Sequence, residues 1–226
     1  MGQAESAVER GGDRLTVHIW SDIVCPWCYV GEHRFESALA RFPHRDAADV
    51  CHRSFELDRN APAVSHTTAV EHLAHKYGLS RQEAEQVEQR AADAAAAEGL
   101  PFRLDRIRTN TFDAHRLLHL AAETGDEQAL LAGLFGAHFA EGRVLSDHET
   151  LVAVAASAGI DAERARRVLE GDSYAAQMRA DAREAAALGI SGVPFFVLNR
   201  RYAISGAQPT ELMLDALNEA WMQLSS

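Results

Sequence analysis

Two of the three cysteines stand close together, in the tetrapeptide Cys25-Pro26-Trp27-Cys28. Cysteines separated by two residues can form a disulfide with each other and exchange it with a disulfide of another molecule. Such a pair can also be half of a zinc site. No second Cys-x-x-Cys follows, and Cys51 alone cannot complete a four-ligand site. The spacing therefore favours redox chemistry, with a Cys25–Cys28 disulfide as the reactive group and no resident metal.

The segments on either side of the motif must hold the sulfurs in place. Residues 15–20 alternate apolar and polar side chains, which predicts a strand, and Pro26 suits the first position of a helix reaching Phe42. Cys25 would then be the helix N-cap, where unpaired backbone N–H groups stabilise a thiolate. We expect Cys25 to attack a substrate disulfide and Cys28 to resolve the mixed disulfide.

The two residues between the cysteines would tune this chemistry. Pro26 restricts the backbone, and the Trp27 indole can shield the sulfurs or form a contact surface. The helical pattern also places Trp27 with Val30 and Phe35 on the inward face. No charged side chain lies between the cysteines, so backbone donors or residues distant in sequence must stabilise a thiolate.

The rest of the chain predicts an α/β fold with a long helical excursion. A second strand is expected at 49–57, helices from about 67 to 188, a hairpin of strands at 193–198 and 202–204, and a last helix at 210–224. The initial β-α-β order predicts two parallel strands. Two pairs have capping-box spacing at helix starts: Ser80 with Glu83, and Ser146 with Glu149.

Composition limits the partners and the location. Acidic residues outnumber basic ones 33 to 22, and the net charge of -11 disfavours binding to nucleic acid or to anionic membranes. No apolar run approaches the roughly 20 residues that cross a bilayer. The first 14 residues lack the apolar segment of a secretory signal. With so few cysteines, these features predict a cytoplasmic protein.

Three segments carry a resemblance to a known family: S-D-I-V-C-P-W-C-Y-V-G at 21–31, Asn110-Thr111-Phe112-Asp113-Ala114-His115-Arg116-Leu117, and G-I-S-G-V-P-F-F-V-L-N-R-R-Y-A-I-S-G-A-Q-P at 189–209. They resemble the DsbA family of thioredoxin-fold oxidoreductases, in particular its FrnE-like branch of dithiol–disulfide isomerases. This implies a thioredoxin-like fold with an inserted all-helical domain. The expected boundaries are a flexible N-terminal segment at 1–14, a thioredoxin-like domain at 15–62 and 189–226, and the helical insertion at 63–188.

The resemblance also implies two features of the site. Val193–Pro194 should be a cis peptide facing the cysteines, with the backbone beside Pro194 pairing with an extended substrate. Thioredoxins place a buried acid six residues before the nucleophile, where this chain has Ile19, so Asp22 is the nearest upstream carboxylate. Asp22 could reach Cys28, cap the strand end or face solvent, and a capping or structural role is favoured.

For His115, His119 and Cys51, the sequence allows either a structural role or a functional one. His115 could overhang the disulfide and tune the thiolate, or be a packed or solvated helix histidine. His115 and His119 have the i,i+4 spacing of metal ligands, but no acidic residue completes an H-E-x-x-H pattern, so the helix-surface reading is favoured. Cys51 is expected to be a structural thiol in the second strand.

The function hypothesis is a thiol–disulfide oxidoreductase or isomerase acting on protein or peptide disulfides. Its reductant would be glutathione or a thioredoxin-type protein, and glutathione could also be a ligand. The alternative is a glutathione-dependent transferase or isomerase, related to the kappa-class and hydroxychromene-carboxylate isomerase enzymes that share this plan. A second alternative is a noncatalytic chaperone that binds clients between its domains.

Overall fold

The computed structural model describes residues 14–224. The flexible segment predicted at 1–14 lies outside this range, apart from Arg14. The strands are β1 (Leu15–Ser21), β2 (Ala48–Ser54), β3 (Phe195–Leu198) and β4 (Tyr202–Ser205). The α-helices are α1 (Pro26–Arg41), α2 (Ala69–Tyr77), α3 (Arg81–Ala97), α4 (Phe112–Thr124), α5 (Glu127–Phe135), α6 (His148–Ser157), α7 (Ala162–Glu170), α8 (Ala175–Ala187) and α9 (Thr210–Met222). A short 3₁₀ helix (Arg45–Ala47) precedes β2, and a π-helical turn (Gly136–Ala140) follows α5.

The four strands form one mixed sheet in the order β2-β1-β3-β4. β1 and β2 are parallel, as the β-α-β order predicts, and β3 is antiparallel to β1 and β4. The second strand was predicted to reach residue 57, but its pairing stops where Ser21 opposes Ser54. β1 ends at that residue, and beyond it the Phe55 N–H bonds to the Ser21 carbonyl at 3.1 Å while the Leu57 N–H bonds to the Asp22 side chain instead of to a strand.

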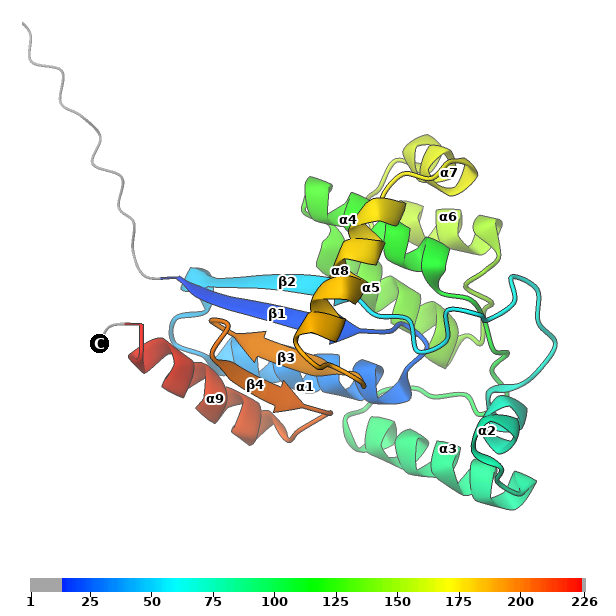
Figure 1. Cartoon of the computed structure of the whole chain (residues 1–226), viewed down its shortest axis with the longest axis horizontal. Coiled ribbons are helices and arrows are strands. Elements are labelled where there is room, and N and C mark those ends of the chain that lie inside the picture. The colour runs from blue at the N-terminus through cyan, green and yellow to red at the C-terminus, as the bar shows by residue number, and fades with distance from the viewer. Residues whose placement is uncertain (1–13, 225–226) are drawn as a thin grey trace, which may run out of the picture.

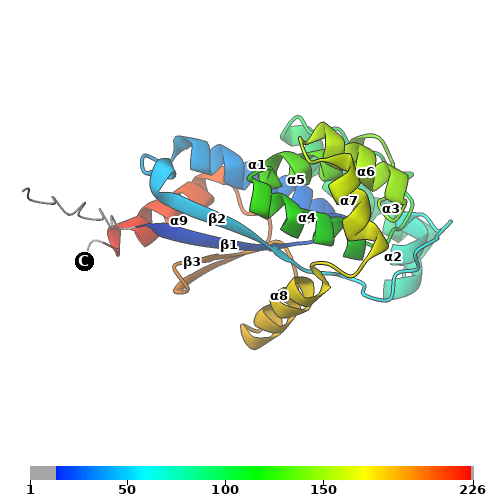
Figure 2. The same cartoon turned by 90° about the horizontal axis from the view of Figure 1, so that it is seen from above.

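Helices cover both faces of the sheet. Figure 2 shows α1 and α9 on one face and α8 on the other. The core on the first face includes Val17 and Ile19 of β1 together with Phe35 and Phe196. On the second face the Trp20 indole N–H donates to the backbone oxygen of Asp181 in α8, over 3.3 Å. The predicted helical insertion, 63–188, thus includes a helix that packs on the sheet.

The remaining helices form a second layer beside the sheet, with α4, α5, α6 and α7 packed on one another (Figure 1). Their apolar core contains Leu117, Leu120 and Leu130, and it continues without a break to Cys25 and Cys28. The two cysteines therefore lie where the helical layer meets the end of β1. Residues far apart in the sequence can reach them there.

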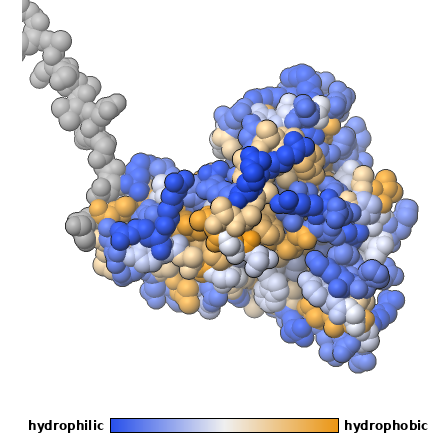
Figure 3. Space-filling view, in the orientation of Figure 1, coloured by the Kyte–Doolittle hydropathy of each residue, from blue (hydrophilic) through white to orange (hydrophobic). Residues whose placement is uncertain are grey.

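The face of the molecule shown in Figure 3 is mostly hydrophilic. On the face shown, apolar side chains gather near the middle, between the sheet and the helical layer. Over residues 14–224, none of the helices combines the length and the apolar character that a bilayer crossing requires.

Helix starts show which capping predictions were right. Ser80 caps α3 through the predicted capping box with Glu83. The box predicted for Ser146 and Glu149 was wrong, because α6 begins one residue later and Asp147 accepts the Thr150 N–H at 3.0 Å. A carboxylate at that position satisfies the free N–H, which leaves the Ser146 hydroxyl to bond elsewhere in the chain.

Candidate active site

The turn between β1 and α1 fixes both sulfurs. The Cys25 N–H donates to the Asp22 carbonyl at 3.0 Å, and α1 begins at Pro26 with Cys25 as its N-cap. Cys25 and Cys28 are 5% and 1% exposed, and both are thiols. Pro26 has no N–H and the Cys28 N–H donates to the Cys25 carbonyl at 3.0 Å, so the Trp27 N–H and the helix dipole are what this uncapped helix start offers to a negative sulfur at Cys25.

A distant loop completes the surroundings of Cys25. The Val193–Pro194 peptide bond is cis, the geometry that the resemblance implies. The Cys25 sulfur lies 3.6 Å from the Val193 carbonyl oxygen. The predicted nucleophile and the predicted substrate-binding residues are therefore neighbours, although 168 residues separate them in sequence.

Cys28 differs from an exposed thiol in its burial and in its pKa. Its sulfur accepts the Asp22 backbone N–H at 3.5 Å. Burial raises the pKa of Cys28 well above its ordinary value, and the adjacent Cys25 raises it further. At neutral pH Cys28 is therefore a protonated thiol. This suits a resolving cysteine, which reacts only after Cys25 has formed the mixed disulfide.

Trp27 is not part of the inward stripe that the helical pattern predicts. Its side chain is 40% exposed, whereas Val30 and Phe35 are buried. Successive residues turn by about 100° around a helix, and Cys28 takes the inward direction at this turn. Trp27 therefore points outward beside the sulfurs, as the contact-surface reading expects.

Gly31 lets the Pro194 loop approach α1. A Cβ at Gly31 would stand 2.8 Å from the Pro194 ring and 3.4 Å from Ala207. No other residue type fits this contact without displacing the proline. Gly31 was not identified as a site residue from the sequence, although it ends the quoted 21–31 segment.

We expect Gly31→Ala to move the Pro194 loop away from Cys25. Overpacking of this kind costs about 1–3 kcal/mol of stability. The misplaced loop should lower the disulfide-exchange rate by about tenfold or more. Chemical denaturation and exchange kinetics would measure the two effects. Gly136→Ala is the matched control, because a Cβ there meets nothing within 4 Å. Equal behaviour of the two variants would show that the contact does not position the loop.

Asp22 is buried and anchors the chain beyond the end of β2. One carboxylate oxygen accepts the Leu57 N–H at 2.7 Å, and the other faces the Val24 N–H at 3.5 Å. The same oxygen lies 3.5 Å from the His115 ring. Contact with Cys28 comes from the backbone of Asp22, and the Asp22 side chain bonds to the chain beyond β2.

The motif at 110–117 connects the helical layer to its surroundings. Asn110 donates to the Ala61 carbonyl at 2.8 Å and accepts the Phe112 N–H at the start of α4. Arg116 is buried and donates to the Ser173 carbonyl at 2.8 Å. His115 is buried, and neither ring nitrogen forms a hydrogen bond. The motif thus contributes His115 to the surroundings of Asp22 and otherwise holds segments together.

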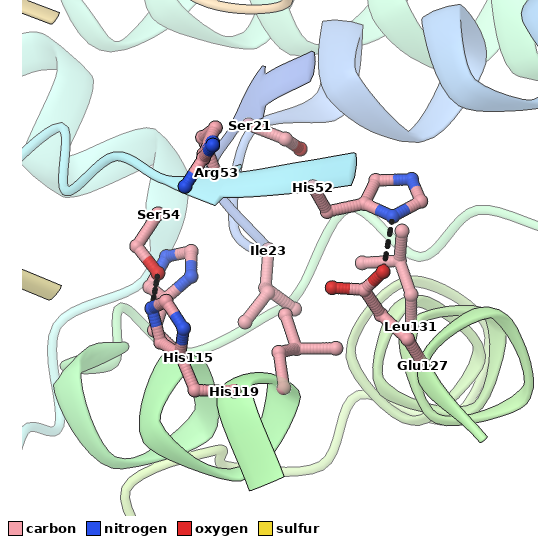
Figure 4. A pocket seen from close by; sticks show the side chains of 10 residues that line it. Ser21, Ile23, His52, Arg53, Ser54, His115, His119, Glu127 and Leu131 are labelled. Carbon is pink, nitrogen blue, oxygen red and sulfur yellow. Dashed lines mark hydrogen bonds and ion pairs between the residues drawn. The ribbon is translucent and has the colours of Figure 1, made fainter. Parts of the chain in front are cut away.

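A pocket with three histidines and the carboxylate of Glu127 in its lining lies between β2 and the helical layer (Figure 4). His119 bonds to the Ser54 hydroxyl at 3.2 Å and pairs with Asp181 at 3.2 Å. His119 thus connects α4 to Ser54 of β2 and to Asp181 of α8. Within residues 14–224, no three histidine, cysteine, aspartate or glutamate side chains are grouped so that they could hold a metal ion.

His52 joins β2 to both α1 and α5 through two carboxylates. Its ring lies 2.9 Å from Glu32 and 3.3 Å from Glu127, and the contact with Glu127 is drawn in Figure 4. Burial lowers the pKa of His52, but the two carboxylates outweigh it and raise the pKa from 6.5 to about 10. His52 is therefore a buried cation at neutral pH.

This ion pair predicts a pH-dependent stability. The folded pKa of His52 lies above the unfolded one, so its contribution is complete below pH 6.5 and disappears as pH approaches 10. We expect the wild-type protein to lose roughly 2–4 kcal/mol between pH 7 and pH 10. His52→Gln should be less stable at pH 7 and should vary less over this range. Urea denaturation at a series of pH values would decide, and parallel curves would contradict the prediction.

The sequence and the fold of this chain both match those of known proteins. The model of the DSBA-like thioredoxin domain matches residues 16–218. The chain belongs to the DSBA-like thioredoxin domain family. A probable DsbA oxidoreductase from Streptomyces coelicolor is 51% identical, with 92% of this chain and 91% of that one covered and a TM-score of 0.88. A search of curated proteins finds no match.

Two more distant structures share the fold of this DSBA-like protein. The cytosolic disulfide reductase DsbM from Pseudomonas aeruginosa is 21% identical, with a TM-score of 0.64 and coverage of 92% of this chain and 99% of that one. A 2-hydroxychromene-2-carboxylate isomerase is 16% identical, with a TM-score of 0.72 and coverage of 93% and 98%. The predicted thioredoxin-like α/β fold is confirmed, and the protein is a disulfide oxidoreductase or isomerase by family.

Proposed function

We propose that this protein exchanges disulfides in proteins or peptides, with Cys25 as the attacking sulfur and Cys28 as the resolving sulfur. The observation that carries the proposal is the position of the Cys25 sulfur, at the start of α1 and 3.6 Å from the carbonyl of Val193. An extended substrate pairing with the backbone beside Pro194 would bring its disulfide to Cys25. The FrnE-like branch remains a prediction from the motifs.

The reaction conserves atoms and electrons in two steps. The Cys25 thiolate attacks one substrate sulfur, the substrate S–S bond breaks, and the released substrate thiolate takes up a proton. Cys28 then loses its proton and attacks the Cys25 sulfur, which breaks the mixed disulfide and releases the second substrate thiol. The substrate gains two electrons and two protons, and Cys25–Cys28 becomes a disulfide. Isomerisation differs in the second step. There a thiol of the substrate, instead of Cys28, attacks the mixed disulfide and releases Cys25 as a thiolate.

Reduction of the Cys25–Cys28 disulfide needs two thiols from glutathione or one dithiol from a thioredoxin-type protein. DsbM supports this direction of electron flow, since it is a cytosolic disulfide reductase and one of its structures contains glutathione. We therefore propose reductase or isomerase activity in the cytoplasm. No bound cofactor beyond the cysteine pair takes part.

Trapping tests the proposal and its rivals together. In Cys28→Ser, Cys25 can still attack but the mixed disulfide cannot be resolved, so substrates should accumulate as covalent adducts on Cys25. Their masses would identify proteins, peptides or glutathione. A glutathione-dependent transferase would instead keep its turnover without Cys28. A chaperone would protect clients equally well with both cysteines replaced, and neither it nor its variants would exchange disulfides.

A further inference from the structure

An open groove lies between α8, the start of α4 and the segment that follows β2. Its volume is about 760 Å³. The floor of the groove is apolar, because Ala61 and Met178 are buried and Phe112 is half-buried. A groove of this size takes a ligand of a few amino-acid residues.

The segments that form two walls of the groove also hold the reactive turn. Glu56 lines the groove, and the next residue, Leu57, donates its N–H to the Asp22 carboxylate at 2.7 Å. The Asp22 carbonyl in turn accepts the Cys25 N–H. The opposite wall, α8, leads directly into the loop with the cis Val193–Pro194 bond. A polypeptide that lies in the groove can therefore extend to the Cys25 sulfur.

Three arginines line this groove against one carboxylate. Arg59, Arg179 and Arg183 are all exposed. Within residues 14–224, none of their guanidinium groups forms an ion pair or a hydrogen bond. Glu56 is the only carboxylate of the lining, and its charge offsets at most one of the three arginines. The groove thus has an excess of positive charge in a chain whose net charge is -11.

Other carboxylates on the same elements do not neutralise these arginines. They do not line the groove, and each pairs with a different cation: Asp58 with Arg108, Asp113 with Arg116, Glu123 with Arg164, Asp181 with Arg53 and Glu184 with Arg200. The three arginines of the groove are therefore available to carboxylates of another molecule.

The spacing along α8 matches an extended chain. Arg179 and Arg183 are four residues apart on one face of the helix, so their backbones are separated by about 6 Å along its axis. In an extended chain, alternate side chains point to the same side at intervals of about 7 Å. Carboxylates on alternate residues of a strand-like segment would therefore meet the two guanidinium groups in turn.

We propose that this groove binds an extended acidic segment of the client polypeptide, with carboxylates on alternate residues facing Arg179 and Arg183. The inference rests on the proposed exchange reaction and names the class of client. Because the chain as a whole is acidic, it repels such a segment over the general surface and attracts it at this groove. Binding there would place the neighbouring disulfide of the client beside Cys25.

Binding can be tested without any exchange chemistry. In a Cys25→Ser, Cys28→Ser protein, fluorescence anisotropy would compare a cysteine-free peptide that alternates glutamate with valine and the same peptide with glutamine for glutamate. We expect the glutamine peptide to bind about tenfold more weakly, the sum of a few exposed ion pairs. Added salt should reduce this difference. Equal binding of the two peptides, or no binding of either, would overturn the proposal.

Two double variants in the same background locate the contact. Arg179→Gln with Arg183→Gln should weaken binding of the glutamate peptide about fivefold to tenfold. Arg90→Gln with Arg167→Gln is the matched control, because it removes two exposed charges outside the groove, and it should bind like the parent. Equal weakening by the two double variants would show an effect of net charge alone and would remove the groove from recognition.

Reversal of the charge tests direct recognition. Arg179→Glu with Arg183→Glu should prefer a lysine version of the peptide to the glutamate version. A preference for the glutamate peptide that persists in this variant would overturn the proposal.

The wild-type protein connects binding to exchange. A disulfide peptide flanked by glutamates should have a KM about tenfold lower than its glutamine counterpart. Because the double-serine protein has no reactive sulfur in the motif, the binding results are independent of exchange activity. Absence of exchange in the wild-type protein would overturn the proposed function alone.

Discussion

Replacing Cys25 with serine is expected to lower the disulfide-exchange rate by at least roughly 10³-fold. A serine hydroxyl stays protonated at neutral pH and cannot form a mixed disulfide, so the first step is lost. Reduction of a fluorescent peptide disulfide by the protein in glutathione buffer would measure the rate. Without glutathione in the buffer, Cys28→Ser should keep the first step and stop at the adduct, which separates attack from resolution.

Cys51→Ser is the control for this series. Cys51 is half-buried in β2, and burial raises the pKa of its thiol, so it should contribute nothing to exchange. The Cys51 variant should therefore match the wild-type rate. Undiminished exchange by Cys25→Ser would exclude Cys25 as the attacking sulfur and leave the mechanism without its first step.

The largest loss of stability is expected from Glu88→Ala. Glu88 and Arg106 form an ion pair at 2.7 Å with both side chains buried. The guanidinium also stacks on Phe102 and Phe139, at 4.2 and 4.7 Å from the ring centres. Removing the carboxylate would leave a buried cation without its partner, which costs about 3–5 kcal/mol. Urea denaturation would measure this change in the free energy of unfolding.

Two further variants distinguish the loss of the Glu88–Arg106 ion pair from the general effect of replacing a glutamate in α3. Glu85→Ala removes an exposed carboxylate of α3 that pairs with Arg81, and should cost less than about 1 kcal/mol. Glu88→Met combined with Arg106→Met replaces both charges with apolar groups, and should recover most of the loss. If Glu88→Ala were no worse than Glu85→Ala, the buried pair would not stabilise the fold.

Local patterns predicted the parts of the site that are close in sequence. The alternation in β1, the proline at the start of α1 and the N-cap position of Cys25 all follow from residue types and spacing. Trp27 was misplaced, because a helical pattern assigns the inward face from an average over several turns. In the first turn of α1, the buried side chain is Cys28 and the exposed one is Trp27.

Features that depend on distant segments could not be predicted in this way. Nothing in the alanine-rich sequence of α8 distinguishes a helix that covers a sheet from one in a bundle. A cavity beside Pro26 likewise combines Arg106, His138 and Lys76 from separate segments, and no local pattern places them together.

One helix carries most of the contacts that orient the reactive sulfur. Along α1, Gly31 touches Pro194, Glu32 meets His52, and Arg34 bonds to Glu98 at 2.6 Å and to the backbone at Ala207. Exposed Trp27 takes no part in this framework. Substitution of Trp27 is therefore expected to alter the surface beside the sulfurs while the contacts that hold α1 in place stay intact.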